Sequence, residues 1–188
     1  MLNNLRDSLK PTLEKVGKTF AATGLSPNVF TVIGLIFAFV SSVVYGFGYE
    51  YSLAIGGVIL LISGFFDIVD GQVARYANKI SKKGGFLDSI FDKIAEVAIF
   101  FGILVGNYAE PYLVFLAITL SLLVSYTRAL ADSAGIKMQG IGIGERAERL
   151  LVIAIVGIIG FMEIAIIIVI IIAAITLIQR VTVLAKNR

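Results

Sequence analysis

Six long runs of apolar residues alternate with short polar segments along the chain. A helix needs about 20 mostly apolar residues to cross the hydrocarbon core of a membrane, and most of these runs approach that length. The expected spans are 27–47, 53–76, 85–106, 111–133, 147–161 and 163–184. The pattern therefore predicts an all-α integral membrane protein with six transmembrane helices.

The first 22 residues follow a different pattern, in which apolar and basic residues recur at helical spacing. The apolar positions are Leu2, Leu5, Leu9, Leu13, Val16 and Phe20, and the basic positions between them are Arg6, Lys10, Lys15 and Lys18. This pattern is typical of an amphipathic helix that lies on a membrane surface. We therefore expect an amphipathic juxtamembrane helix at 1–22 and one six-helix transmembrane domain at 23–188.

The basic residues are unevenly distributed between the connections. Segments 48–52, 107–110 and 160–163 contain no Lys or Arg and one Glu each, whereas the connections 75–83 and 137–149 and both ends of the chain hold most of the positive charge. Cytoplasmic loops of membrane proteins are enriched in Lys and Arg, so both termini and the active-site side are expected to face the cytoplasm. The net charge of +3 reflects this topology and attraction to anionic headgroups, and no nucleic-acid partner is expected.

Composition narrows the possible chemistry. The chain is 58% hydrophobic and 15% charged, and it contains neither Cys nor His. Thiolate nucleophiles, disulfides and imidazole acid–base catalysis are therefore excluded. A general base in this protein must be a carboxylate, a lysine or a bound hydroxide.

Four aspartates interrupt the second and third apolar runs. Asp67 and Asp70 are three residues apart and Asp88 and Asp92 are four apart, so each pair lies on one face of its helix. An ionised side chain at membrane depth costs at least ~2.5–3.5 kcal/mol, so the four carboxylates imply a metal, a water-filled cavity or both. Two facing helices that carry these pairs could surround a divalent cation.

These aspartates belong to a longer pattern that resembles the signature of the CDP-alcohol phosphotransferases. The pattern is D-x2-D-G-x2-A-R-x8-G-x3-D-x3-D, at Asp67, Asp70, Gly71, Ala74, Arg75, Gly84, Asp88 and Asp92, and it has no departure from that signature. The segment from Leu25 to Asn28, with Thr31, resembles the entry to the first membrane helix of that family. The resemblance implies a homodimer with an active site open to the cytosol and the lipid bilayer.

The resemblance also implies a reaction: transfer of a phosphatidyl-type group from a CDP-linked lipid to an alcohol, with release of CMP. Oxygen ligands suit Mg²⁺ or Mn²⁺, which would lie on the diphosphate. The implied metal ligands are Asp67, Asp70 and Asp88, with Asp92 as the base that accepts the proton of the attacking hydroxyl and touches a second metal. The implied CDP-lipid-binding residues are Asn28, Thr31, Asp67, Gly71, Ala74 and Arg75.

The carboxyl-terminal half bears on the acceptor. Segments 125–129 and 144–150 resemble those of phosphatidylinositol-phosphate synthases and their archaeal counterparts, the archaetidylinositol-phosphate synthases. Inositol phosphate is a dianion, and the cations that the resemblance implies for it are Arg128, Arg146, Arg149 and Arg180, whose guanidinium forks match phosphate. Topology alone also predicts arginines at cytoplasmic helix ends. Glycerol 3-phosphate and serine stay open as acceptors, as do diacylglycerol and archaeol as lipids.

Two alternatives of another class remain. A divalent-cation transporter could also carry carboxylates on adjacent membrane helices, but its pathway should continue through polar residues in the outer half of the bilayer. The outer halves of the predicted helices are almost uniformly apolar, as in the run 164–175. A noncatalytic scaffold would be expected to have lost at least one aspartate of the signature. The sequence therefore favours a transferase.

Overall fold

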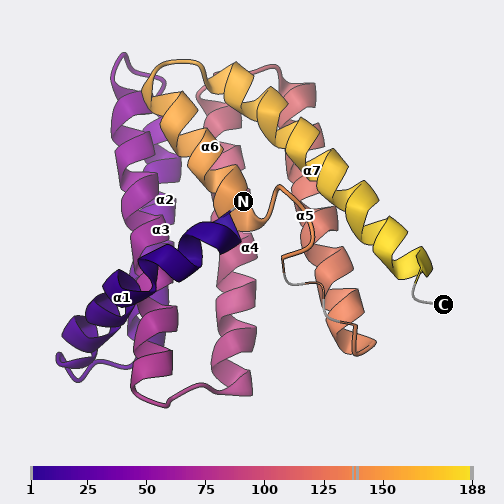
Figure 1. The fold of residues 1–188 in the computed structure, drawn as a ribbon. Helices are drawn as coiled ribbons and strands as arrows, with labels where there is room; N and C mark the ends of the chain where they lie inside the picture. The colour runs from indigo at the N-terminus through magenta and orange to yellow at the C-terminus, as the bar shows by residue number, and fades with distance from the viewer. Residues whose placement is uncertain (1, 137, 139, 187–188) are drawn as a thin grey trace.

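The computed structural model describes residues 2–136, 138 and 140–186, with side chains described for 11–136, 138 and 140–185. Over these residues the chain forms seven α-helices and no strand (Figure 1). The helices are α1 (Leu2–Ala21), α2 (Pro27–Gly46), α3 (Ser52–Tyr76), α4 (Lys82–Val105), α5 (Pro111–Ser133), α6 (Arg146–Ile158) and α7 (Met162–Lys186).

Each predicted apolar segment is helical, and most boundaries differ from the prediction by one to three residues. Helix α4 begins three residues early, because the side chain of Ser81 caps it by accepting a hydrogen bond from the backbone N–H of Gly84 at 3.0 Å. Helix α6 ends at Ile158, three residues earlier than expected.

Within the described part of the chain, four helices are long and apolar enough to cross a membrane: α2, α3, α5 and α7. Helix α4 has a suitable length but carries Asp88, Asp92, Lys93 and Glu96. Helix α6 has only 13 residues. The fold is therefore all-helical with several membrane-length helices, and the six crossings stay a prediction.

Helix α1 crosses obliquely over one end of α3 (Figure 1). Its Val16 and Phe20 pack against a small cluster formed by Phe30 of α2 with Val69 and Val73 of α3. The predicted side chains at Leu2, Leu5, Arg6, Leu9 and Lys10 lie outside the described residues. The described part of α1 thus covers the end of α3 that carries the first aspartate pair.

Small residues bring α2 close to both α3 and α4. The hydroxyl of Ser63 donates to the carbonyl oxygen of Gly34 at 2.8 Å, and that of Ser42 donates to the carbonyl oxygen of Ala98. A Cβ added at Gly102 would overlap the backbone of Ser42, so this contact requires glycine. Small residues and buried hydroxyl groups are the usual means by which membrane helices pack closely. This packing fixes α3 and α4 around α2 and sets their aspartates opposite one another.

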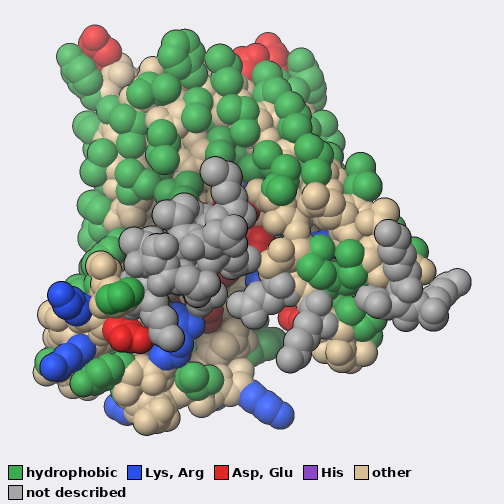
Figure 2. Space-filling model, in the orientation of Figure 1, with side chains coloured by type: hydrophobic (Ala, Val, Ile, Leu, Met, Phe, Trp, Pro, Cys, Tyr) green, Lys and Arg blue, Asp and Glu red, His purple; other side chains and the backbone are tan. Residues whose placement is uncertain are grey.

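The surface separates charged from apolar side chains. In Figure 2 the Lys and Arg side chains gather at the lower end of the molecule, and hydrophobic side chains cover most of the upper part. Large apolar side chains are widely exposed, among them Phe101, Phe115 and Ile178 at 62%, 72% and 64%. So broad an apolar surface is expected of a protein whose solvent is a bilayer.

Candidate active site

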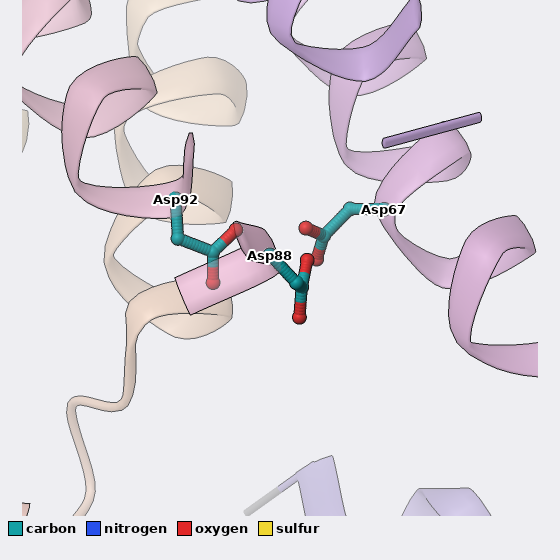
Figure 3. Close-up of side chains that lie close together, drawn as sticks. All are labelled: Asp67, Asp88 and Asp92. Atoms are coloured by element: carbon teal, nitrogen blue, oxygen red, sulfur yellow. The ribbon is translucent and has the colours of Figure 1, made fainter. Parts of the chain in front are cut away.

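Three carboxylates meet between α3 and α4. Asp67 points from α3 toward Asp88 and Asp92 of α4 (Figure 3), and one oxygen of each lies within 4.8 Å of the others. The side-chain oxygen Oδ1 of Asp88 is buried and accepts no hydrogen bond in the described part of the chain. Carboxylates this close repel one another unless a cation joins them. Oxygen donors in this arrangement fit Mg²⁺ or Mn²⁺.

The fourth aspartate is placed differently. Asp70 lies on α3 three residues after Asp67, but the group of close carboxylates in the described residues does not include it. Its side chain is 6% exposed, and its Oδ2 atom is buried without a hydrogen-bond partner among the described residues. The structure thus brings together three of the four predicted metal ligands, and a metal contact of Asp70 stays a prediction.

Arg146 joins this carboxylate group from α6. Its Nη1 atom lies 2.7 Å from Oδ1 of Asp92 and donates a hydrogen bond to Oδ1 of Asp67 at 3.1 Å. Arg146 is the first residue of α6, which a capping box formed by Glu145 and Glu148 fixes in place. The guanidinium therefore compensates part of the negative charge of two carboxylates.

Arg149, one turn further along α6, has a different environment. It is fully buried, and its Nε and Nη2 atoms both donate to Oε1 of Glu96, at 3.0 and 2.6 Å. Its Nη1 atom donates to the carbonyl oxygen of Gly144 at 2.7 Å. Each nitrogen of this guanidinium therefore already has a protein acceptor. Glu96 is equally buried, and the sequence pattern predicted no role for it.

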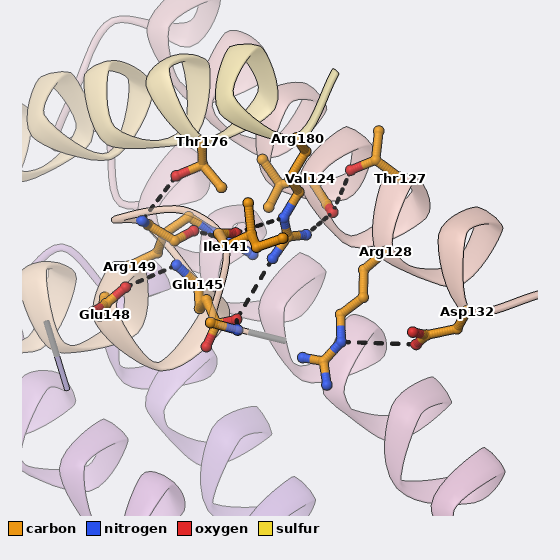
Figure 4. A network of polar contacts seen from close by, with 12 residues as sticks. Val124, Thr127, Arg128, Asp132, Ile141, Glu145, Glu148, Arg149, Thr176 and Arg180 are labelled. Carbon is orange, nitrogen blue, oxygen red and sulfur yellow. Dashed lines mark hydrogen bonds and ion pairs between the residues drawn. The ribbon is translucent and has the colours of Figure 1, made fainter. Parts of the chain in front are cut away.

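The other two predicted acceptor-binding arginines also differ from each other (Figure 4). Arg180 is 2% exposed, donates to the carbonyl oxygens of Ile141 and Val124, and lies 3.6 Å from a carboxylate oxygen of Glu145. Arg128 has a side chain that is 44% exposed, and its Nε atom is 3.9 Å from a carboxylate oxygen of Asp132.

All four arginines line one polar cavity of about 410 Å³ between α4, α5, α6 and α7. Asp88, Asp92 and Lys93 of α4 form part of its wall, so the cavity adjoins the carboxylate group. Gly85 also lines it, and a Cβ at that position would meet no atom within 4 Å. The space beside Gly85 is therefore open to a ligand.

The predicted CDP-lipid-binding residues lie on α2 and α3. Asp67, Gly71 and Ala74 share one face of α3, at spacings of four and three residues. Thr31 of α2 lines a small cavity together with Asp67. Arg75 and Asn28 each lie beside a glycine of the signature. A Cβ atom built at Gly71 would lie 3.3 Å from Nη2 of Arg75, and a Cβ atom built at Gly84 would lie 3.5 Å from Oδ1 of Asn28.

A larger, apolar cavity lies elsewhere. It is an apolar groove of about 820 Å³ between α2 and α4, lined by residues such as Phe39, Phe47 and Phe101. Lys93 lines both this groove and the polar cavity. Neither Lys93 nor Glu96 was predicted to have a role. Their position within four residues of Asp92, in an otherwise apolar run, is the signal that points to them.

The fold and site together define a helical membrane protein whose carboxylate group borders a cavity with an arginine-lined wall. The chain belongs to the CDP-alcohol phosphatidyltransferase family, whose sequence pattern matches residues 24–181.

Individual relatives extend this likeness. The chain is 40% identical over 181 residues to the archaetidylinositol phosphate synthase of Pyrococcus horikoshii. The aligned region covers 96% of this chain and 95% of the relative. The fold of this chain matches the crystal structure of the phosphatidylinositol phosphate synthase of Mycobacterium tuberculosis with CDP-DAG bound. The TM-score is 0.78 at 22% sequence identity, and the match covers 90% of this chain and 92% of the synthase. A structure of the same synthase in complex with manganese and citrate matches with equal TM-score and identity and covers 90% and 87%.

Proposed function

We propose that this protein transfers the lipid phosphate group of a CDP-linked lipid to a hydroxyl of inositol phosphate and releases CMP. The observation that carries the proposal is the contact between the three-carboxylate group and the arginine-lined cavity. The full-length similarity to a synthase named for archaetidylinositol phosphate favours inositol phosphate over glycerol 3-phosphate or serine. Archaeol and diacylglycerol are both possible as lipids.

The metal is proposed to be Mg²⁺ or Mn²⁺, held by Asp67, Asp88 and Asp92, with Asp70 as a further ligand. The crystal structure of the Mycobacterium synthase with manganese supports a divalent ion of this kind. When bound, the ion would act as a Lewis acid that draws charge from the diphosphate. Oδ2 of Asp70 and Oδ1 of Asp88, which have no hydrogen-bond partner among the described residues, could serve as oxygen ligands for it.

Asp92 is proposed as the general base. It lines the acceptor cavity, so its carboxylate can accept the proton of the acceptor hydroxyl. The hydroxyl oxygen forms a bond to the lipid-linked phosphorus, the bond from that phosphorus to the bridging oxygen breaks, and CMP leaves with the bridging oxygen. Arg146, 2.7 Å from Asp92, holds this carboxylate toward the cavity.

The CDP-lipid is proposed to bind along α2 and α3, through Asn28, Thr31, Asp67, Gly71, Ala74 and Arg75. The small side chains at Gly71 and Ala74 permit close approach of the nucleotide to α3. Arg75 provides a charge-assisted contact to phosphate or nucleotide. The acceptor phosphate is assigned to the cavity lined by Arg128, Arg146, Arg149 and Arg180.

The proposed membrane arrangement has six crossings, α2 to α7, in one domain at 23–188. Helix α1, residues 1–22 in the prediction, rests on the cytoplasmic surface, and both termini and the active site face the cytoplasm. The gathering of basic side chains at one end supports this orientation (Figure 2). A homodimer is proposed from the family resemblance.

The test is CMP release by the purified protein in detergent with Mg²⁺ or Mn²⁺. CDP-archaeol and CDP-diacylglycerol are compared as donors, and inositol phosphate, glycerol 3-phosphate, serine and free inositol as acceptors. Release with inositol phosphate alone is the expected result. Release with another acceptor would overturn the acceptor, and no release with any combination would overturn the transferase and favour a transporter or scaffold.

A further inference from the structure

Thr176 carries a buried hydroxyl on an otherwise apolar stretch of α7. It is the one polar residue in the sequence between Glu163 and Gln179, and its side chain is 0% exposed. The hydroxyl donates to the carbonyl oxygen of Ile172 at 2.7 Å and accepts a hydrogen bond from the backbone N–H of Gly144 at 2.8 Å (Figure 4). The first bond is local to α7, whereas the second joins α7 to the connection that leads into α6.

Two glycines bring this connection against α7. A Cβ at Gly142 would overlap the side chain of Thr176, and one at Gly144 would lie 2.8 Å from the carbonyl oxygen of Ile172. Gly142 also has a φ of +117°, which residues with a Cβ rarely adopt. The approach buries the N–H of Gly144, and a buried N–H without an acceptor is costly. Thr176 supplies that acceptor.

The bond to Thr176 lies two residues before Arg146, the first residue of α6. Nη1 of Arg146 lies 2.7 Å from Oδ1 of Asp92 and donates to Oδ1 of Asp67 at 3.1 Å. The side chain therefore leaves the backbone at the very start of α6, and its reach to the carboxylates depends on where that helix begins.

Arg180 also contacts this connection, one turn further along α7. Its Nε atom donates to the carbonyl oxygen of Ile141 at 3.0 Å, and its Nη2 atom lies 3.6 Å from a carboxylate oxygen of Glu145. These contacts hold an earlier part of the connection and a side chain. The Thr176 hydroxyl instead holds the backbone itself, two residues before Arg146.

We propose that the Thr176 hydroxyl, by fixing the backbone at Gly144, holds Arg146 against the carboxylate group of α3 and α4. Thr176 is thus a positioning residue of the metal site, and it touches neither the ion nor a substrate. This inference rests on the proposed function and adds a residue of α7 to its metal site. Without the hydroxyl, the guanidinium should compensate the carboxylates less fully, and they should attract a divalent ion more strongly.

The first test removes the hydroxyl and keeps the shape of the side chain. Thr176→Val should bind Mn²⁺ about threefold more tightly than the wild type, in electron paramagnetic resonance titrations of the full chain in detergent. Combined with Arg146→Met, the same substitution should leave the Mn²⁺ affinity unchanged, because the group through which it acts is gone. Thr176→Ser keeps the acceptor and should restore the wild-type affinity. Thr182→Val is the matched control, because Thr182 is exposed on the same helix and its hydroxyl donates to the carbonyl oxygen of Gln179.

Amide hydrogen exchange separates this inference from the proposed function, because it requires neither metal nor turnover. Peptides that contain residues 144–149 should exchange at least about tenfold faster in Thr176→Val than in Thr182→Val. Thr176→Ala repeats both measurements if the valine variant does not fold. Unchanged exchange would overturn the inference. An equal change in Mn²⁺ affinity with and without Arg146 would also overturn it, since Thr176 would then act by another route. If the wild type bound no Mn²⁺, the proposed metal site would be wrong, and the exchange alone would decide whether Thr176 fixes the start of α6.

Discussion

Two acid–arginine pairs join α4 to α6 one helical turn apart, and they have opposite environments. In the first, Asp92 and Arg146 have side chains that are 21% and 17% exposed, and the arginine also reaches Asp67. In the second, Glu96 and Arg149 are both at 0%. Each pair joins a carboxylate of α4 to an arginine of α6, so the charges alone do not separate a ligand-facing pair from a structural one. The two pairs differ in the exposed fraction of their side chains and in whether the arginine has an N–H donor without a partner among the described residues.

The buried pair should show the largest effect, and it should be on stability. Arg149→Met leaves the Glu96 carboxylate buried without its partner, which is expected to lower the free energy of unfolding by about 3–5 kcal/mol. Thermal unfolding in detergent measures this loss. Arg128→Met is the control, because an exposed arginine 3.9 Å from its partner should contribute less than about 0.5 kcal/mol.

The double variant Glu96→Met with Arg149→Met sharpens this result. Two apolar residues of similar length remove both charges, so much of the lost stability should return. If Arg149→Met kept the wild-type free energy of unfolding and bound the acceptor more weakly, the structural role would be wrong. Arg149 would then be assigned to the acceptor-binding site.

The partly exposed pair, Asp92 with Arg146, should affect turnover. Asp92→Asn removes the proposed base and is expected to lower the rate of CMP release by at least ~100-fold. The unfolding temperature should stay near that of the wild type, because the carboxylate is partly exposed. Glu110→Gln, an exposed carboxylate between α4 and α5, should retain the wild-type rate. A wild-type rate in Asp92→Asn would remove this residue from the mechanism.

The contrast also shows which features the sequence could predict. The six apolar runs predicted the positions of α2 to α7, because the length and hydropathy of a helix can be read from its own segment of sequence. The spacing of Asp67 with Asp70 and of Asp88 with Asp92 predicted a shared site, because residues three or four apart share a helix face and the two helices are consecutive. The structure supports that grouping. Asp70 follows the same spacing rule and lies outside this group of close carboxylates, and its metal contact stays a prediction.

The features that could not be predicted depend on contacts between distant segments. The pairing of Glu96 with Arg149 joins residues 53 positions apart, and it requires the register of α6 on α4. The partners of Arg180 are backbone carbonyl oxygens of Val124 and Ile141, and a backbone acceptor has no signature in side-chain types.

The smallest predicted effect concerns Arg146, which belongs to both the metal site and the acceptor cavity. Its Nη1 atom lies near Asp67 and Asp92, two of the three carboxylates proposed to bind the metal. Arg146→Met removes one positive charge next to them and increases their attraction for a divalent ion. We expect Mn²⁺ to bind about tenfold more tightly, equivalent to ~1.4 kcal/mol. Electron paramagnetic resonance titration of free Mn²⁺ measures this without turnover.

Arg128→Met provides the matched comparison, because Arg128 lines the same cavity but its ion-pair partner is Asp132. Its Mn²⁺ affinity should stay unchanged, while both variants should bind inositol phosphate more weakly. Weaker Mn²⁺ binding in Arg146→Met would instead mean that the guanidinium organises the carboxylates for the ion. In that case the partly exposed pair, Asp92 with Arg146, would also be structural, and the two pairs would differ only in their solvent access.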